Sequence, residues 1–306
     1  MMDSFCRGTR GGWVKLEQNP LLGGDLGTCF DISMLKEDGR IRLYFSWRDK
    51  ANISVCTSED GIHWDAPQTC IGPRTAKEGR EDDLNRPSVV KAGTIFHMWY
   101  TGQHKPGQAD GTSDIFHAVS EDGVHFVRTG DAPVLRAEAP WEKQAVMCPS
   151  VLWDEEKRVF RMWYSGGEQY EPTAIGYAES RDGLVWTKSP LNPVFQAEPQ
   201  NAWEQHKAAG CQVLWHDGWF RMFYIGYHNE DYAQIGMARS RDGITGWERS
   251  VYNPIIAPDA DAWDAEACYK PFVLNMGSRW MLWYNGRKGS KEQIGAAVLE
   301  GTELNF

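Results

Sequence analysis

The sequence predicts an all-β protein: a five-bladed β-propeller with four-stranded antiparallel blades, forming one domain over residues 1–306. Three observations predict this fold. An aromatic run recurs five times, a polar turn recurs four times, and a segment near the N-terminus matches the segments that follow the turns. Short period-2 runs rich in Val, Ile and aromatic residues, bounded by Gly, Asp and Ser, are typical of antiparallel strands. Four such strands in a meander form one propeller blade.

The aromatic run is the predicted second strand of each blade. Its copies are 43–47, 98–102, 162–166, 222–226 and 282–286, and four of them end in glycine. They recur roughly every 60 residues, a spacing in the range of propeller blades and related arrays. The recurrence therefore predicts five blades.

The polar turn follows the predicted third strand and has the pattern Ser-x-Asp-Gly. It occurs at 58–61, 120–123, 180–183 and 240–243. Short polar side chains in such turns hydrogen-bond the neighbouring backbone. Because the pattern repeats from copy to copy, we interpret it as part of the scaffold and not of a catalytic site.

The N-terminal segment supplies the fourth strand that the last blade lacks. Residues 13–20, Trp-Val-Lys-Leu-Glu-Gln-Asn-Pro, match 186–193 and 247–254, which follow two of the turns. We therefore expect residues 13–18 to form the outer strand of the last blade and to close the ring. Closure leaves no long open strand edge between the first and last blades.

Composition limits the classes of partner. The formal net charge is −10, which argues against a nucleic acid or an anionic membrane as the partner. No apolar run approaches the roughly 18 residues of a spanning helix, and the N-terminus lacks the apolar segment of a secretory signal. Seven cysteines without a CxxC pair indicate neither a disulfide framework nor a zinc knuckle. We expect a cytoplasmic protein without a cofactor, and the oligomeric state stays open.

Positions that vary where the scaffold repeats are the candidates for chemistry. Aligning the starts of the five predicted inner strands gives one such row: Asp31, Arg86, Cys148, Gly210 and Lys270. Three of these residues are charged at the predicted centre of the ring, where a charge must be paired or functional.

A second varied row lies four residues earlier. It consists of Gly27, Asp82, Gln144, His206 and Glu266, with Lys207 and Tyr269 close by. The unrepeated carboxylates Asp31, Asp82 and Glu266 are our candidate catalytic residues. Basic residues of the two rows offer an alternative use, the binding of a phosphate or a uronate carboxylate. By contrast, the Trp-acid pairs at 141–142, 203–204 and 263–264 repeat in register, and we interpret them as anchors of the connectors.

Aromatic side chains at the ends of the second strands are candidates for substrate binding. The flat faces that could stack on sugar rings are those of Trp47, Tyr170, Tyr227 and His228. The alternative is that these side chains cap the blades. With Arg86, Gln144, His206, Lys207, Tyr269 and Lys270, they complete the predicted substrate-binding set.

Five blades, an aspartate at the start of the first inner strand, and N-terminal closure resemble the propeller glycosidases of families 43, 32, 62, 68 and 130, with family 43 the most similar. The resemblance implies an acidic residue in the first blade, a second in the next, and a glutamate acid in the third. Asp31 matches the first. Arg86-Pro87 stands where the second is expected, and Met147-Cys148-Pro149 where the third is expected.

The sequence therefore supports three functions. The first is a glycoside hydrolase that acts on a small oligosaccharide or glycoside in a central pocket by a two-carboxylate mechanism. The second is a glycoside phosphorylase that uses inorganic phosphate, favoured by the basic residues. The third is a non-catalytic carbohydrate-binding propeller, favoured by the two missing carboxylates. Each implies a carbohydrate partner. The sugar, the linkage, the anomeric outcome, and a divalent ion or a water in the central channel stay open.

Overall fold

The computed structural model describes residues 7–74 and 81–306. These residues form strands and turns, with short 3₁₀ helices at Gly24–Leu26, Arg48–Lys50 and Pro140–Glu142. They divide into two compact units: the described part of Met1–Phe30 with Phe195–Phe306, and Asp31–Val194. None of the helices in these two ranges is long and apolar enough to cross a membrane. The all-β prediction is confirmed, and the single domain stays a prediction.

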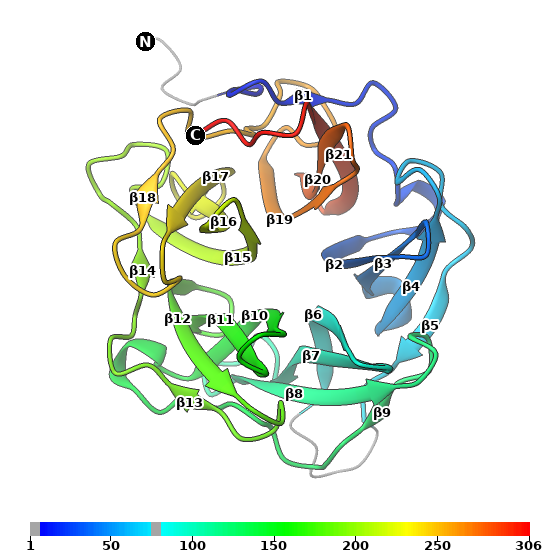
Figure 1. Ribbon diagram of the computed structural model, residues 1–306, viewed down its shortest axis with the longest axis vertical. Helices are drawn as coiled ribbons and strands as arrows, with labels where there is room; N and C mark the ends of the chain where they lie inside the picture. Colours follow the sequence, from blue (N-terminus) through cyan, green and yellow to red (C-terminus); the bar gives the residue numbers. More distant parts are fainter. Residues whose placement is uncertain (1–6, 75–80) are drawn as a thin grey trace. The chain divides into compact units, whose positions relative to one another are not determined.

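The unit Asp31–Val194 contains three antiparallel groups, each a meander of four strands (Figure 1). The first group is β2 (Cys29–Glu37, in which the boundary of the unit falls), β3 (Arg40–Trp47), β4 (Asn52–Ser58) and β5 (Gln68–Ile71). The second is β6 (Asp83–Ala92), β7 (Ile95–His104), β8 (Thr112–Ser120) and β9 (Val127–Arg128). The third is β10 (Ala145–Asp154), β11 (Val159–Gly167), β12 (Pro172–Ser180) and β13 (Thr187–Lys188).

The other unit contains two such groups. One consists of β15 (Lys207–His216), β16 (Trp219–Tyr227), β17 (Ala233–Ser240) and β18 (Glu248–Arg249), preceded by the short strand β14 (Phe195–Gln196). The last consists of β19 (Ala267–Asn275), β20 (Arg279–Lys288), β21 (Lys291–Glu300) and the N-terminal strand β1 (Val14–Lys15). A single parallel bridge between Ala233 and Ala267 joins the two groups into one sheet.

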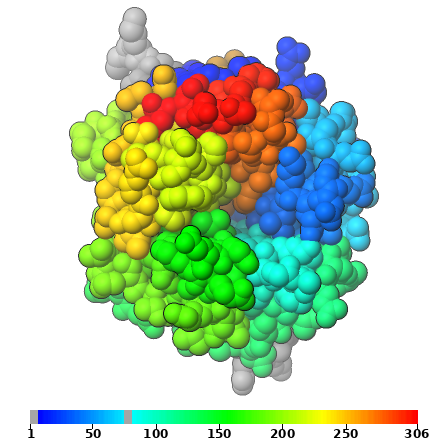
Figure 2. Space-filling view, in the orientation of Figure 1, coloured from blue at the N-terminus to red at the C-terminus, as the bar shows by residue number. Residues whose placement is uncertain are grey.

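The N-terminal strand pairs with the last group, as predicted, although it is shorter than the predicted 13–18. Val14 lies opposite Val298 in β21 (Figure 1), and on the surface of this unit the N-terminal segment lies beside the C-terminal one (Figure 2). Asn19 then exchanges two hydrogen bonds of 2.8 Å with the backbone of Ala296. The matching asparagines of the other copies bond their third strands in the same way: Asn192 with Tyr177 and Asn253 with Met237.

The aromatic runs are buried on both faces of their strands. The largest side chains with almost no exposure include Trp99, Tyr100, Trp163, Tyr164, Phe223, Tyr224, Trp283 and Tyr284. Successive side chains of a strand point to opposite faces of the sheet. When both faces are packed against other parts of the protein, both sets of side chains are buried. This explains why the runs are nearly continuous in apolar residues instead of alternating with polar ones.

The Ser-x-Asp-Gly turns are held by their own side chains. In the third copy, the Gly183 N–H donates to Ser180 Oγ at 2.8 Å, and the Leu184 and Val185 N–H groups donate to Asp182 Oδ1 at 2.9 Å. The N–H groups of Val185 and Leu184 lower the pKa of the Asp182 carboxyl. The other three copies make the same bonds. The predicted local hydrogen bonds are confirmed, and the absence of a catalytic role for these turns stays a prediction.

A fully buried carboxylate lies in the connector before the first strand of four groups. Glu142 accepts a hydrogen bond of 2.6 Å from the Tyr164 hydroxyl and one of 2.8 Å from the Lys188 ammonium. Its counterparts bind a cation of the fourth strand in the same way: Glu81 with Arg128, Glu204 with Arg249, and Asp264 with Lys15. All four carboxylates have an exposed fraction of 0%. We refer to these four carboxylates with their cations as the connector ion pairs.

The tryptophan of each Trp-acid pair occupies space that two glycines leave open. A Cβ atom on Gly166 or Gly176 would lie 2.4 and 2.8 Å from the Trp141 ring, and Trp203 and Trp263 lie over glycines in the same manner. The interpretation of these pairs as connector anchors is confirmed. In the β6–β9 group, Phe116 stands where the third strands of other groups have glycine, and its ring lies 2.5 Å from the Cβ position of Gly102.

Candidate functional site

The five residues of the first varied row share one unusual backbone conformation. Their φ angles are 53° for Asp31, 56° for Arg86, 54° for Cys148, 52° for Gly210 and 50° for Lys270. Four of the five are not glycine, and a non-glycine residue in the left-handed region is uncommon and strained.

A bulge accompanies this conformation. In the first strands β6, β10, β15 and β19, the register with the second strand shifts at this point. A bulge bends the strand and re-aims a side chain. The five residues of the first varied row are therefore structurally equivalent. They share the same backbone conformation but differ in side chain.

Asp31 is buried beside Arg86 in the unit Asp31–Val194. Its exposed fraction is 3%, and Arg86 Nε lies 3.6 Å from its Oδ2. Within the two described ranges, no donor reaches Asp31 Oδ2 within hydrogen-bond distance. A buried carboxylate oxygen with a nearby positive charge and no hydrogen-bond donor is suited to bind a water or a reacting atom.

Two buried amides hold Arg86 in place. Arg86 Nη1 donates to Asn85 Oδ1 at 2.7 Å, and Asn85 Nδ2 donates to Gln103 Oε1 at 2.9 Å. Sequence reasoning missed Asn85 and Gln103. A signal was present, because the residue before the left-handed position is Phe30, Met147, Ala209 or Tyr269 in the other copies, and Asn85 is the only amide among the five.

The other two candidate carboxylates are half-exposed and bound elsewhere. Asp82 Oδ2 accepts the backbone N–H of Lys105 at 2.8 Å and lies 3.0 Å from His104 Nδ1. Glu266 accepts the N–H of Gly289 at 3.0 Å and lies 3.5 Å from Arg287 Nε. Asp82 belongs to the same unit as Asp31, and Glu266 to the other. The contacts of Asp82 are with the β7–β8 loop, and those of Glu266 are with the end of β20.

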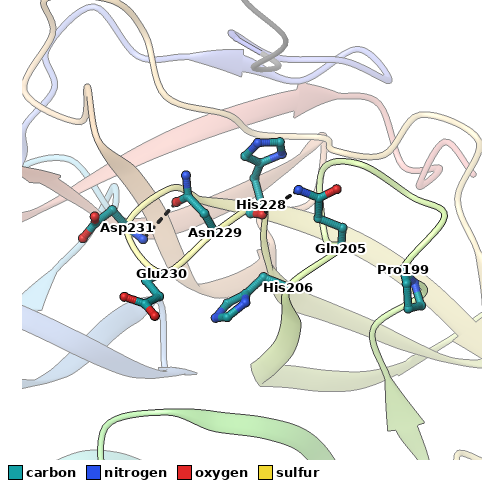
Figure 3. Close-up of a pocket in the computed structure, with 7 residues that line it drawn as sticks. All are labelled: Pro199, Gln205, His206, His228, Asn229, Glu230 and Asp231. Carbon is teal, nitrogen blue, oxygen red and sulfur yellow. Dashed lines mark hydrogen bonds between the residues drawn. The ribbon is translucent and has the colours of Figure 1, made fainter.

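A polar pocket of about 700 Å³ lies beside β15 and β16. Its lining residues are Pro199, Gln205, His206, His228, Asn229, Glu230 and Asp231 (Figure 3). Gln205 Nε2 donates to the carbonyl of His228 at 3.1 Å, and the His228 Nδ1 atom lies 2.7 Å from the carbonyl of Ala202. The structure therefore brings two predicted binding residues, His206 and His228, into one pocket. The contribution of Asn229, Glu230 and Asp231 was missed, because a polar loop carries no repeat signal.

Two predicted lysines and two predicted tyrosines belong to the same unit as this pocket. Lys207 of β15 lies directly opposite Tyr227 of β16. Its Nζ atom is 4.3 Å from the centre of the Tyr227 ring. Tyr227 and Tyr269 both pack against the cluster of Ile225, Ala233 and Ala267. The exposed fractions of Lys207 and Lys270 are 3% and 7%.

Three other predicted binding residues belong to the unit Asp31–Val194. Gln144 is half-buried, and its carbonyl accepts the N–H of Ser113 at 3.4 Å. Trp47 is half-buried beside Phe45. Tyr170 is 50% exposed, next to Gln169, whose amide Nε2 donates to the carbonyls of His104 and Thr112 and so holds the β7–β8 loop. The binding roles of these three stay predictions.

No group of three or more His, Cys, Asp or Glu side chains in the described ranges is arranged to hold a metal ion. The six described cysteines are buried, and none of them forms a disulfide.

The repeated four-stranded groups are those expected of a five-bladed propeller glycosidase. The chain belongs to glycosyl hydrolases family 43, whose family model matches residues 18–300. The resemblance stated from the sequence is therefore confirmed. Membership of a carbohydrate-active family implies a carbohydrate substrate.

Three curated relatives have different descriptions. An uncharacterized protein of Mycobacterium tuberculosis is 30% identical, over 85% of this chain and 88% of that protein. The A type blood N-acetyl-alpha-D-galactosamine deacetylase of Flavonifractor plautii is 22% identical, over 74% of this chain and 34% of that protein. The beta-1,2-mannobiose phosphorylase of Thermoanaerobacter sp. is 21% identical, over 77% of this chain and 96% of that protein.

Among solved structures, a thermostable family-43 glycoside hydrolase superposes with a TM-score of 0.73 and 18% identity, over 94% of this chain and 96% of that one. This similarity shows the fold.

Proposed function

We propose that the protein is a glycosidase that cleaves a small oligosaccharide or glycoside, with Asp31 as the ionised base or nucleophile. The observation that carries the proposal is the Asp31 carboxylate, which is buried and lies 3.6 Å from a guanidinium. Its Oδ2 atom has no hydrogen-bond donor among residues 7–74 and 81–306. It stands where the family resemblance implies the acidic residue of the first blade.

Asp31 would act on the anomeric carbon in one of two ways. As a nucleophile, its carboxylate oxygen bonds to that carbon while the leaving oxygen takes a proton from an acid, and water then hydrolyses the glycosyl-enzyme. As a base, it takes a proton from a water that attacks the same carbon. The positive charge of Arg86 stabilises the carboxylate in either role.

The general acid is the open part of this proposal. Met147-Cys148-Pro149 lacks the glutamate that the resemblance implies, so we assign the acid to Asp82 or Glu266. Glu266→Gln and Asp82→Asn separate the two. Loss of the true acid should slow a glycoside with a poor leaving group by at least about 10²-fold and largely spare one whose leaving group needs no proton.

A phosphorylase is the second candidate, favoured by the similarity to a beta-1,2-mannobiose phosphorylase over 96% of that protein. In that reaction, inorganic phosphate replaces water as the group that bonds to the anomeric carbon. The residues available to hold it are Lys207, Lys270, His206 and Arg86.

One assay distinguishes these functions. A panel of nitrophenyl glycosides is incubated with and without inorganic phosphate, using the wild-type protein and Asp31→Asn. Turnover without phosphate that disappears in Asp31→Asn supports hydrolysis, whereas phosphate-dependent turnover supports the phosphorylase. Sugar binding without any turnover would show a carbohydrate-binding protein instead, and full activity of Asp31→Asn would overturn the assigned mechanism.

We further propose that the chain is one five-bladed propeller closed by its N-terminal strand. The pairing of β1 with β21 and the family membership support this. Deleting residues 1–20 removes β1 and leaves the edge of β21 unpaired, so we expect aggregation or a large loss of stability. A deletion variant that stays monomeric with unchanged thermal unfolding would contradict closure.

A further inference from the structure

Lys270 is a buried cation without a partner in the described part of the chain. Its exposed fraction is 7%, and no ion pair or hydrogen bond joins it to a residue of 7–74 or 81–306. The aliphatic part of the side chain is buried, whereas the ammonium is not among the atoms cut off from solvent. Half-buried cations elsewhere in the described chain differ in this respect. Lys15 and Arg249 contact buried carboxylates at 2.7 and 2.6 Å, and Arg86 lies beside Asp31.

An unpaired buried charge has a physical cost. Lysine is almost never fully buried unless it is paired, and removing a charge from water is unfavourable unless a partner compensates. The left-handed conformation of Lys270, with φ of 50°, adds strain. A side chain held in this way at a position that varies from copy to copy is better explained by an absent ligand than by folding.

The neighbours of Lys270 leave room for the lysine and supply flat faces. A Cβ atom on Gly210 would lie 3.3 Å from Lys270 Cδ, so the glycine in this copy keeps the lysine side chain uncrowded. Tyr269 precedes Lys270 and packs on the same apolar cluster as Tyr227. The Lys207 ammonium lies over the Tyr227 ring. Two buried lysines and two tyrosine rings therefore share one unit, and aromatic faces are well suited to sugar rings.

We infer that Lys270 binds an oxyanion, a carboxylate or a phosphate group, of the ligand of this protein. Three donor hydrogens on a compact ammonium match such a group, and charge-assisted hydrogen bonds are stronger than neutral ones. The oxyanion has two sources: it belongs to the sugar, as in a uronide or a sugar phosphate, or it is free inorganic phosphate. The sugar-borne case rests on the proposed function, whereas oxyanion binding itself does not.

Calorimetric titration at constant ionic strength tests the inference without any assay of turnover. The probes are inorganic phosphate, glucuronate, galacturonate and glucose 6-phosphate, with glucose and galactose as neutral counterparts. The variants are Lys270→Met, which removes the charge at similar volume, and Lys270→Arg, which retains it. Lys157→Met is the matched control, because Lys157 is exposed on the β10–β11 turn.

We expect at least one oxyanion to bind the wild-type protein and its affinity to fall about 10- to 100-fold in Lys270→Met. Lys270→Arg should recover part of this loss, and Lys157→Met should bind as the wild type does. Binding of inorganic phosphate identifies the free anion as the source, and binding of the acidic sugars alone identifies the sugar. Failure of every oxyanion to bind, or equal affinity in Lys270→Met, would overturn the inference.

Thermal unfolding without ligand is the second measurement. Removing an unpaired buried charge should leave Lys270→Met folded and at least as stable as the wild type. A clear loss of stability would show that Lys270 serves the fold. Failure of the proposed function appears separately, as the absence of glycoside turnover or as activity that persists in Asp31→Asn, and leaves the titration interpretable.

Discussion

Two sets of positions in this protein recur from group to group and yet differ in how their residues vary. The connector ion pairs keep the same chemistry in four groups: a carboxylate with no exposure, bound to a cation from the fourth strand. The row of left-handed residues keeps the same backbone in five groups, but its side chains are Asp31, Arg86, Cys148, Gly210 and Lys270.

The difference separates the needs of the fold from those of a ligand. Each group needs its connector fastened to its strands, so the same carboxylate and cation recur. A ligand is a single asymmetric object, so residues that bind it have no reason to repeat. The same strained backbone conformation therefore holds a chemically different side chain in each group.

The largest expected effect is on stability, in Asp264→Asn. This change removes the charge that Lys15 and Tyr284 bind at 2.7 and 2.9 Å. Breaking a buried ion pair costs about 3–5 kcal/mol, and we expect about 3 kcal/mol because Asp259 still contacts Lys15. Denaturant unfolding measures it. The folded fraction should keep its turnover, and loss of turnover at unchanged stability would break the comparison.

Asp31→Asn is the same chemical change in the other set and should have the opposite outcome. We expect turnover to fall by at least about 100-fold, about 2.7 kcal/mol in the barrier. The fold should persist because asparagine tolerates the left-handed conformation. Turnover and denaturant unfolding are measured on the same preparation. A variant that unfolds more easily but turns over normally would place Asp31 with the scaffold.

Asp182→Ala tests a repeated turn in place of a repeated ion pair. Loss of the hydrogen bonds from Leu184 and Val185 should lower stability by roughly 0.5–2 kcal/mol, as the loss of local caps does. Turnover per folded molecule should not change. If turnover vanished at normal stability, the face of the molecule that carries the turns would be the functional one.

His117 sharpens the comparison because it varies between groups without belonging to the candidate site. Burial, and then the neighbouring His97, lowers its pKa to about 3. Between pH 6.5 and 3, the unfolded chain therefore binds a proton that folded His117 does not, and stability falls as the pH falls. We expect a loss of about 1 kcal/mol from pH 6.5 to 5.5.

Denaturant unfolding at several pH values measures this dependence. His117→Met introduces the residue that β17 has at the equivalent position, Met237, and should reduce the slope. An unchanged slope would assign the acid sensitivity to other groups. Variation between groups thus marks a candidate for function only where it coincides with an unusual backbone or an unpaired charge.

Much of the architecture could be predicted from the sequence because its signals are short-range and repeated. The Ser-x-Asp-Gly turn bonds to itself within a few residues, so Asp182 behaves as its local sequence indicates. Asn19 aligns with asparagines of the other copies in the sequence, and it makes the equivalent hydrogen bonds to the backbone of the third strand. The connector carboxylate Glu81 was missed, because no tryptophan precedes it and Phe116 fills the space over Gly102 instead.

The sequence by itself determined the number of groups, the order of their strands, the place of the N-terminal strand and the row of positions that vary. These follow from hydrophobic periodicity and turn chemistry, which act over a few residues and recur often enough to be aligned. Only the tertiary structure decided which charges meet: Lys15 with Asp264, Arg86 with Asp31, and Lys270 with none of the described residues. Such pairs join residues far apart in the chain, and whether a buried charge finds a partner depends on how the strands pack, which no local pattern encodes.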